Sequence, residues 1–224
     1  MSILDARPEA ILFDLDGTLA DTALDLGRVA NMLRFEEGLE PLAMQVLRPH
    51  TSSGVRGMLH AAFGLMPGDA PYAALSERFL SHYEHHLCVE TRLFDQMPEV
   101  LDALDDQDIK WGIVTNKRSR YTNPLIAALG LAKRAACVIS GDSTPHPKPA
   151  PDSLLHACAL AGVRPEQCIY VGDDLRDIQA GRSACMKTVA AAYGYLGLDT
   201  PIERWNADAI IQSPDELLKL LRLI

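Results

Sequence analysis

The pattern of hydrophobic and polar positions divides the chain into three regions. Residues 11–13 form a short apolar run that ends at an Asp-x-Asp-Gly sequence, which predicts a buried strand followed by a loop. Residues 21–90 carry apolar side chains at helical spacing, interrupted by glycine- and serine-containing breaks, and predict about four helices. From residue 98 onward, helical and strand patterns alternate.

The alternating region predicts most of an α/β fold. We expect strands at 109–115, 137–140, 168–172, 186–193 and 208–211, and helices at 98–107, 119–129, 151–162, 174–184 and 214–223. This alternation is typical of βαβ crossovers in a doubly wound, mostly parallel sheet. The first strand must join the same sheet, so the helical block is an insertion. We therefore expect an α/β core domain at 1–20 and 92–224, and an α-helical cap domain at 21–91.

Composition and charge narrow the possible partners. The 224 residues are 48% hydrophobic and 23% charged, as in ordinary globular proteins. A net charge of −9 argues against nucleic acid or an anionic membrane as the main partner. We see no signal peptide and no apolar segment long enough to span a membrane. Five scattered cysteines without CxxC spacing favour reduced thiols. We expect a cytoplasmic protein, as a monomer or a weak dimer.

The ends of the predicted strands carry the candidate chemistry, because ligands of such sheets bind beyond the carboxyl ends of the strands. These positions hold Asp14, Asp16, Thr115, Asn116, Asp173 and Asp174, and Lys148 lies in the loop after the third strand. Asp14 and Asp173 could converge on one hard cation. Oxygen ligands without paired histidines or cysteines favour Mg²⁺ over zinc.

A carboxylate beside a lysine and Mg²⁺ suits phosphoryl transfer, because positioned cations reduce the repulsion between an anionic nucleophile and a phosphate. Asp14 would be the nucleophile and would form an aspartyl-phosphate. Asp16 would protonate the leaving alcohol and then take a proton from the attacking water. Thr115 would offer a hydroxyl to the phosphate.

Four motifs stand in the order found in one enzyme superfamily. They are DLDGTLADT (14–22), VTN (114–116), Lys148 within PKPAPDSL, and VGDDLRDI (171–178). With them, nearly the whole chain resembles the haloacid dehalogenase-like phosphatases. The resemblance implies that Asp14 is the nucleophile and Asp16 the acid and base. It also implies that Thr115 and Lys148 bind phosphate, and we expect Asn116 to bind phosphate with them.

The same resemblance implies a metal site. Mg²⁺ would be held by Asp14, Asp173 and the backbone carbonyl of Asp16. Asp177 would lie next to these ligands without binding the metal itself. Asp174 stands where a serine is common, which adds a charge next to the metal. The second acid, Asp16, argues against a true dehalogenase, which lacks it.

The helical insertion resembles the small cap of the phosphoglycolate phosphatase-like subgroup. Four stretches, at 52–63, 111–117, 171–182 and 191–196, look most like N-acetylmuramic acid 6-phosphate phosphatases. The expected substrate is therefore a small phosphorylated acid or sugar, with N-acetylmuramic acid 6-phosphate ahead of 2-phosphoglycolate. Arg56, in a small-residue loop that opens a cap helix, could bind a substrate carboxylate. It could equally be a surface arginine.

Two alternative functions stay open at this point. A sugar phosphomutase would use the same scaffold with a cap group that returns the phosphate to a sugar. A phospho-accepting signalling domain would also place acids, a threonine and a lysine at strand ends, although it would not need the helical insertion.

Two positions depart from the family's common glycines. They are Gln96, before the helix at 98–107, and Cys185, after the helix at 174–184. A left-handed backbone at Cys185 would cost about 1 kcal/mol relative to glycine.

Overall fold

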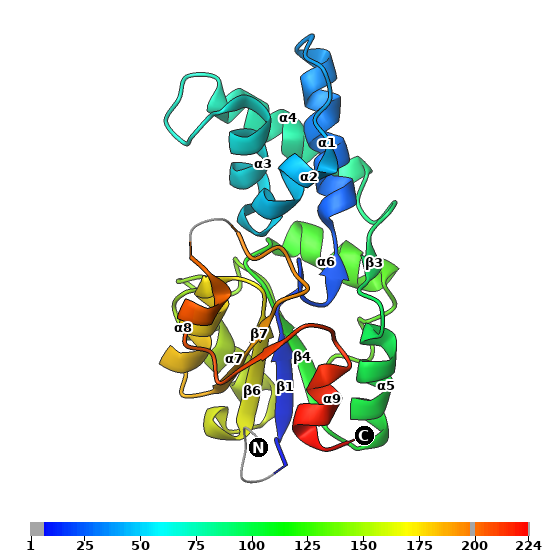
Figure 1. Cartoon of the computed structure of the whole chain (residues 1–224), viewed down its shortest axis with the longest axis vertical. Coiled ribbons are helices and arrows are strands. Elements are labelled where there is room, and N and C mark those ends of the chain that lie inside the picture. The colour runs from blue at the N-terminus through cyan, green and yellow to red at the C-terminus, as the bar shows by residue number, and fades with distance from the viewer. Residues whose placement is uncertain (1–6, 198–199, 224) are drawn as a thin grey trace.

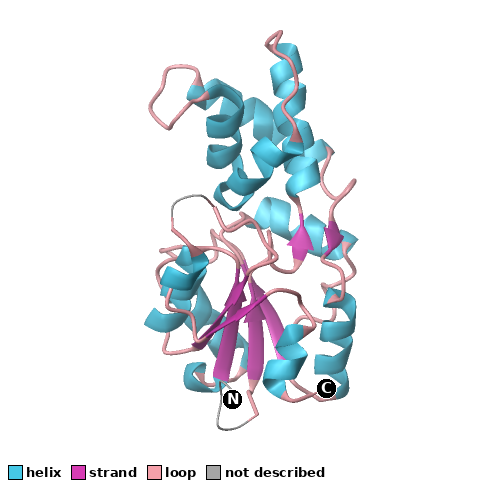
Figure 2. Ribbon diagram, viewed as in Figure 1, coloured by secondary structure: helices cyan, strands magenta, loops and turns pink. Residues whose placement is uncertain are grey.

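The computed structural model describes residues 7–197 and 200–223, and it has a helical part stacked on an α/β part (Figures 1 and 2). The core is a six-stranded, fully parallel sheet in the order β5-β4-β1-β6-β7-β8. Its strands are β1 (Ala10–Phe13), β4 (Lys110–Val114), β5 (Val138–Ile139), β6 (Cys168–Gly172), β7 (Lys187–Ala191) and β8 (Ala209–Ile211). The chain builds outward from β1 first to one side and then to the other. The switch point therefore lies at β1.

Helices cover both faces of this sheet, as the alternation predicted. On one face Ile11 and Phe13 pack with α5 (Met97–Asp106), α6 (Ser119–Ala128) and α9 (Glu216–Leu221). On the other face Leu12 packs with α7 (Asp152–Ala161) and α8 (Leu175–Ser183). Because β1 is buried on both faces, it is a continuous apolar run rather than an alternating one. The α/β, doubly wound, parallel fold is thus confirmed.

The inserted helices form a separate layer at the carboxyl end of the sheet (Figure 1). They are α1 (Ala23–Glu36), α2 (Met44–Leu47), the 3₁₀ helix η1 (Arg48–Ser53), α3 (Gly54–Phe63) and α4 (Tyr72–His85). This cap has its own apolar cluster, which includes Leu33, Met58 and Phe79. Two further 3₁₀ turns, η2 (Pro165–Gln167) and η3 (Ile202–Arg204), lie in the core.

The two connections between cap and core run side by side. They pair as the antiparallel strands β2 (Ala20–Asp21) and β3 (Arg92–Leu93), which the hydrophobic pattern did not predict because each has only two residues. The buried carboxylate of Asp25, in α1, links the outgoing and returning segments of the chain. It accepts hydrogen bonds from the backbone amides of Val89, Glu90 and Thr91 at 2.9–3.0 Å. Asp25 therefore fixes the start of the first cap helix against the segment that returns to the core.

Gln96 and Cys185 adopt the left-handed backbone that glycine favours. Their φ angles are 69° and 61°. Gln96 stands directly before α5, and Cys185 follows the end of α8. The expectation of left-handed geometry at Cys185 is therefore confirmed, and Gln96 shares it.

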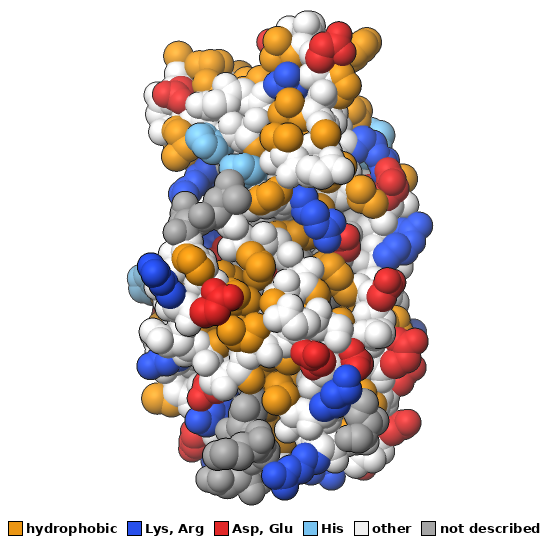
Figure 3. Space-filling view, in the orientation of Figure 1, with side chains coloured by type: hydrophobic (Ala, Val, Ile, Leu, Met, Phe, Trp, Pro, Cys, Tyr) orange, Lys and Arg blue, Asp and Glu red, His pale blue; other side chains and the backbone are white. Residues whose placement is uncertain are grey.

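The surface carries charges of both signs. On the face drawn in Figure 3, acidic and basic side chains are interspersed over the core. Within the described residues, no helix is long and apolar enough to cross a membrane.

Candidate active site

Three carboxylates converge at the switch point of the sheet. Asp14 follows β1, Asp173 follows β6, and Asp177 lies in the first turn of α8. One oxygen from each lies within 4.8 Å of the others, and all three residues are buried. Hard oxygen donors at this spacing fit Mg²⁺. The sequence placed Asp177 behind the metal ligands, whereas the structure brings its carboxylate into the cluster itself. The side chain of Asp16 lies outside it.

Burial of these acids changes their proton affinity. Burial raises the pKa of Asp14 to about 7, with a smaller rise from Asp177, although Lys148 opposes both effects. Burial, and then the neighbouring Asp14 and Asp177, raise the pKa of Asp173 well above its ordinary value. Like charges in a buried site favour proton uptake until a cation binds. The cluster is therefore built to receive positive charge.

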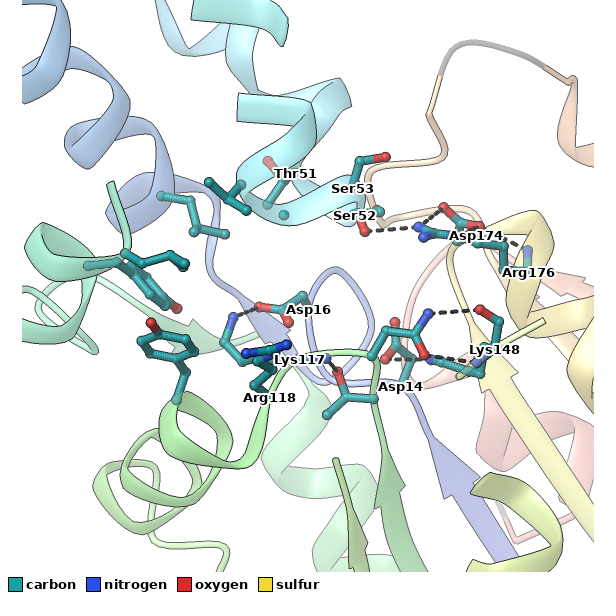
Figure 4. A pocket seen from close by; sticks show the side chains of 18 of the residues that line it. Asp14, Asp16, Thr51, Ser52, Ser53, Lys117, Arg118, Lys148, Asp174 and Arg176 are labelled. Atoms are coloured by element: carbon teal, nitrogen blue, oxygen red, sulfur yellow. Dashed lines mark hydrogen bonds and ion pairs between the residues drawn. The ribbon is translucent and has the colours of Figure 1, made fainter. Parts of the chain in front are cut away.

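Lys148 supplies part of that charge from within the protein. Its buried ammonium lies 2.8 Å from Asp14 Oδ1 and 2.7 Å from Asp177 Oδ1. It also donates to the Tyr170 hydroxyl at 2.7 Å and to the Val114 carbonyl at 3.1 Å. Burial alone would lower the pKa of Lys148, but the two carboxylates more than offset this effect and raise it. Lys148 thus stays charged beside Asp14 (Figure 4).

Asn116 holds the lysine loop in place. Its amide nitrogen donates to the Lys148 carbonyl, and its amide oxygen accepts from the Lys148 backbone nitrogen, both at 2.9 Å. The amide group of Asn116 is thus occupied by the protein, which indicates a positioning role. Thr115 is buried and lines the cavity that lies between cap and core. Its hydroxyl accepts a hydrogen bond from the Lys117 backbone nitrogen.

Asp16 has a lysine of its own, which the sequence did not point to. Lys117 Nζ lies 2.8 Å from Asp16 Oδ1, and the Thr22 hydroxyl donates to the same oxygen at 2.7 Å. The Lys117 ammonium also lies 4.9 Å from the ring centroid of Tyr83 in α4 of the cap. Lys117 directly follows the Val-Thr-Asn motif, and this position at a strand end is the sequence feature that could have marked it as a site residue. Lys117 links Asp16, the predicted acid and base, to Tyr83 of the cap.

A cap residue contacts one carboxylate of the acid cluster. Ser52, in η1, donates its hydroxyl to Asp173 Oδ2 at 3.1 Å. The Tyr195 backbone nitrogen donates to the same oxygen at 2.9 Å, and the Thr18 hydroxyl donates to Oδ1 at 3.0 Å. Asp173 is therefore oriented by the cap, by the loop after β7 and by the first motif together.

Two glycines leave room for Asp173. A Cβ at Gly17, where φ is +92°, would lie 2.2 Å from Asp173 Oδ2. A Cβ at Gly194 would lie 2.3 Å from Asp173 Cβ. Any side chain at either position would displace the carboxylate. The glycine of the Asp-x-Asp-Gly motif is thus explained by close packing as well as by its turn.

Tyr195 connects the loop after β7 to residues 21–23, where the chain enters the cap, and the sequence did not single out this residue. Its hydroxyl accepts from the backbone nitrogens of Thr22 and Ala23 at 2.7 and 3.0 Å, and donates to Asp21 Oδ1 at 3.0 Å. Arg48 of η1 pairs with Asp21 and lies over the Tyr195 ring. Tyr195 therefore contacts Asp173 of the acid cluster, the connection between core and cap, and Arg48 of the cap.

Asp174 has a structural partner rather than a place in the acid cluster. Its side chain is the N-cap of α8 and forms a capping box with Asp177. It also pairs with the Arg176 guanidinium, at 2.8 Å for both nitrogen–oxygen contacts. Arg176 in turn donates to the Ser52 carbonyl at 2.9 Å, so this pair fastens the cap (Figure 4).

Arg56 is not brought into the site. Gly54 and Val55 line the cavity, but Arg56 does not, and its side chain is exposed. The next residues of α3 are buried in the cap, so the helix turns Arg56 away from the cavity.

The cavity between cap and core has a volume of about 510 Å³. Its core side includes Asp14, Asp16, Thr115, Asn116, Lys117, Arg118 and Lys148, and its cap side includes Leu26, Ser52, Val55, Phe79, Leu80 and Tyr83. A space of this size holds a ligand well above a two-carbon acid.

At the switch point of this parallel sheet, a buried carboxylate lies beside a buried lysine and an acid cluster that could hold a hard cation. This arrangement is typical of phosphoryl-transfer sites. The chain matches the family model "Haloacid dehalogenase-like hydrolase" over residues 11–191, and it belongs to that family.

Named relatives match almost the whole chain. An N-acetylmuramic acid 6-phosphate phosphatase from Pseudomonas aeruginosa is 40% identical, covering 96% of this chain and 95% of the relative. A phosphoglycolate phosphatase from Xanthomonas campestris is 43% identical, covering 94% and 95%. The crystal structure of "a predicted phosphoglycolate phosphatase" from Haemophilus somnus superposes with a TM-score of 0.84 at 27% identity, covering 97% and 99%. The family resemblance is confirmed, but these identities do not separate the two substrates.

Proposed function

We propose that the protein is a Mg²⁺-dependent phosphomonoesterase that acts on a small phosphorylated metabolite through an aspartyl-phosphate on Asp14. The observation that carries this proposal is the convergence of Asp14, Asp173 and Asp177 beside the Lys148 ammonium. Family membership supports the same chemistry. When held by Asp14, Asp173 and the backbone carbonyl of Asp16, with the Asp177 carboxylate beside them, Mg²⁺ would supply positive charge that reduces repulsion between the nucleophile and the phosphate.

The first step transfers the phosphoryl group to the protein. An Asp14 oxygen attacks phosphorus while the bond to the leaving alcohol breaks, and Lys148 offsets the charge on the phosphate oxygens. Asp16 gives its proton to the leaving oxygen. Thr115 lines the phosphate side of the cavity, and Asn116 positions Lys148 through its two backbone hydrogen bonds.

The second step restores the protein. Asp16 takes a proton from a water molecule, whose oxygen attacks phosphorus and breaks the bond to Asp14. Phosphate leaves, and Asp16 again holds its proton. Lys117 and Thr22 keep the Asp16 carboxyl facing the cavity in both steps. The cap, held to the core by the contacts of Ser52 and Arg176, would limit the access of bulk water to both steps.

Cavity size favours a sugar phosphate over a two-carbon acid. 2-Phosphoglycolate has about nine non-hydrogen atoms and N-acetylmuramic acid 6-phosphate about 24, and only the larger molecule approaches the size that pockets of several hundred Å³ hold. The cavity measures about 510 Å³. We therefore place N-acetylmuramic acid 6-phosphate first. 2-Phosphoglycolate is the second candidate, because relatives of that name are equally similar.

The test is a steady-state comparison of purified protein with excess Mg²⁺. We expect kcat/KM for N-acetylmuramic acid 6-phosphate to exceed that for 2-phosphoglycolate by at least about tenfold. The reverse order would assign the second candidate. Interconversion of phosphate isomers without phosphate release would indicate a phosphomutase, and absence of turnover with any ester would contradict the enzymatic proposal.

A further inference from the structure

The cavity contains one basic side chain without an acidic partner. Five basic residues line it, and four form ion pairs: Lys117 with Asp16, Lys148 with Asp14 and Asp177, Arg176 with Asp174, and Arg120 with Glu84. The fifth is Arg118. Among the described residues, its guanidinium has no hydrogen bond and no ion pair.

The acid that Arg118 influences through space does not bind it. Asp142 is held by the Ser119 backbone nitrogen at 2.9 Å and by the Ser119 hydroxyl at 3.0 Å. These hydrogen bonds lower the pKa of Asp142, and Arg118 contributes only a weaker electrostatic effect. The donors of the Arg118 guanidinium are therefore available to a ligand.

Arg118 lies on the same side of the cavity as Asp16 and Lys117. It is the N-cap residue of α6 and directly follows Lys117, the lysine that pairs with Asp16. Figure 4 shows Arg118 and Lys117 together on the core side of the cavity, below the cap residues. A substrate whose phosphate lies at Asp14 and Lys148, and whose leaving oxygen faces Asp16, would extend past this arginine.

Part of the opposite wall is apolar, while Thr51, Ser52 and Ser53 make another part of it polar. Val55, Phe79 and Leu80 of the cap line the same cavity, together with Tyr83. A leaving group that fits here has an apolar or ring surface toward the cap and an anionic group toward the core. A carboxylate matches the planar fork of an arginine with two parallel hydrogen bonds.

We propose that Arg118 binds a carboxylate on the leaving group and so selects phosphorylated acid sugars over neutral sugar phosphates. This inference rests on the proposed phosphatase function and names a specificity residue for it. It assigns to Arg118 the carboxylate-binding role considered for Arg56 from the sequence. A charge-assisted hydrogen-bonded pair of about 1.5–3 kcal/mol corresponds to about 10- to 100-fold in kcat/KM.

The experiment compares two esters that differ in the carboxylate. N-Acetylmuramic acid 6-phosphate and N-acetylglucosamine 6-phosphate share the ring and the phosphate, but only the first has the lactyl acid. In Arg118→Gln we expect kcat/KM to fall by about 10- to 100-fold for the acid ester, chiefly through KM, and by less than about twofold for the neutral ester. Arg118→Lys should recover part of the loss. Arg204→Gln, at an exposed core arginine outside the cavity, is the matched control.

Each outcome is decisive. An equal loss for both esters would mean that Arg118 acts on the phosphate or on the fold, and no loss for the acid ester would mean that it does not touch the carboxylate. Either result overturns the inference while the phosphatase proposal stands. If the wild type hydrolyses only 2-phosphoglycolate, the same comparison uses 2-hydroxyethyl phosphate as the neutral ester. If the wild type hydrolyses no ester, the phosphatase proposal itself fails.

Discussion

Replacing Asp173 with asparagine should stabilise the metal-free protein while removing its response to Mg²⁺. At 4.8 Å, the limit of the cluster's oxygen separations, two carboxylates repel by about 3.5 kcal/mol at an effective dielectric constant of about 20. Asparagine removes the charge. It keeps an oxygen for the Ser52 and Tyr195 donors, and its amide nitrogen can donate to the Thr18 hydroxyl, which can rotate to accept.

The stabilisation should depend on pH. An acid whose pKa is raised on folding binds more protons in the folded state, so folding stability falls as pH rises from the unfolded value, about 3.9, through the folded value. The folded pKa of Asp14 is about 7 and that of Asp173 is raised as well. We therefore expect Asp173→Asn to exceed the wild type by about 1 kcal/mol at pH 5 and about 2–4 kcal/mol at pH 8.

The assay is urea unfolding in EDTA across this pH range, followed by thermal unfolding with and without Mg²⁺. Asp95→Asn removes the same charge at an exposed site and should change stability by less than about 0.5 kcal/mol. Mg²⁺ should raise the Tm of the wild type and of the control but not of Asp173→Asn. A variant that is no more stable than the wild type at pH 8, or that Mg²⁺ stabilises equally, would refute the reasoning.

Three further substitutions test other parts of the structure. Lys148→Met should destabilise the protein by about 3–5 kcal/mol, because it leaves two buried carboxylates without their cation, and should reduce kcat by at least about 100-fold; unchanged urea unfolding or turnover would contradict this expectation. Tyr195→Phe should raise KM with little change in circular dichroism, because it removes the acceptor for two amides at the start of the cap, and an unaltered KM would refute a hinge role. Cys185→Gly should add about 1 kcal/mol to the free energy of unfolding by relieving the left-handed backbone, and a loss of stability would show that the exposed cysteine side chain matters more than its φ.

The sequence was sufficient for the fold because its signals were local. The buried run before Asp14 and the alternation after residue 98 depend on periodicity, and the structure has the predicted strands within one or two residues. The two-residue strands β2 and β3 were missed because no periodicity exists over two residues. These strands pair because the chain leaves the core for the cap and returns to the core at neighbouring points.

The site was predictable where a strand end fixes a residue and not where the cap meets the core. The topology of a doubly wound sheet brings Asp14, Thr115 and Asp173 to one edge whatever the loops do. Ser52 and Tyr195 reach Asp173 only through the packing of distant segments, which no local pattern encodes. The position of Arg56 could not be predicted for the same reason. Whether its side chain faces the cavity depends on how α3 packs against the neighbouring helices.

The sequence does not identify the substrate for the same reason, because substrate contacts depend on how the cap packs against the core. The core residues proposed to bind phosphate follow from the motifs, whereas the wall of the cavity comes from both cap and core. Lys117 and Arg118 are adjacent in sequence, yet only the structure shows that one is paired with Asp16 and the other is unpaired among the described residues.

Phosphate release by Asp14→Asn tests the central claim most directly. With N-acetylmuramic acid 6-phosphate and excess Mg²⁺, the account predicts a loss of at least about 1,000-fold in kcat, because the nucleophile is removed. The far-ultraviolet circular dichroism should match that of the wild type, since asparagine has nearly the same shape, and Asp95→Asn should keep full activity. A folded Asp14→Asn protein that releases phosphate within about tenfold of the wild-type rate would contradict the assignment of Asp14 as the nucleophile.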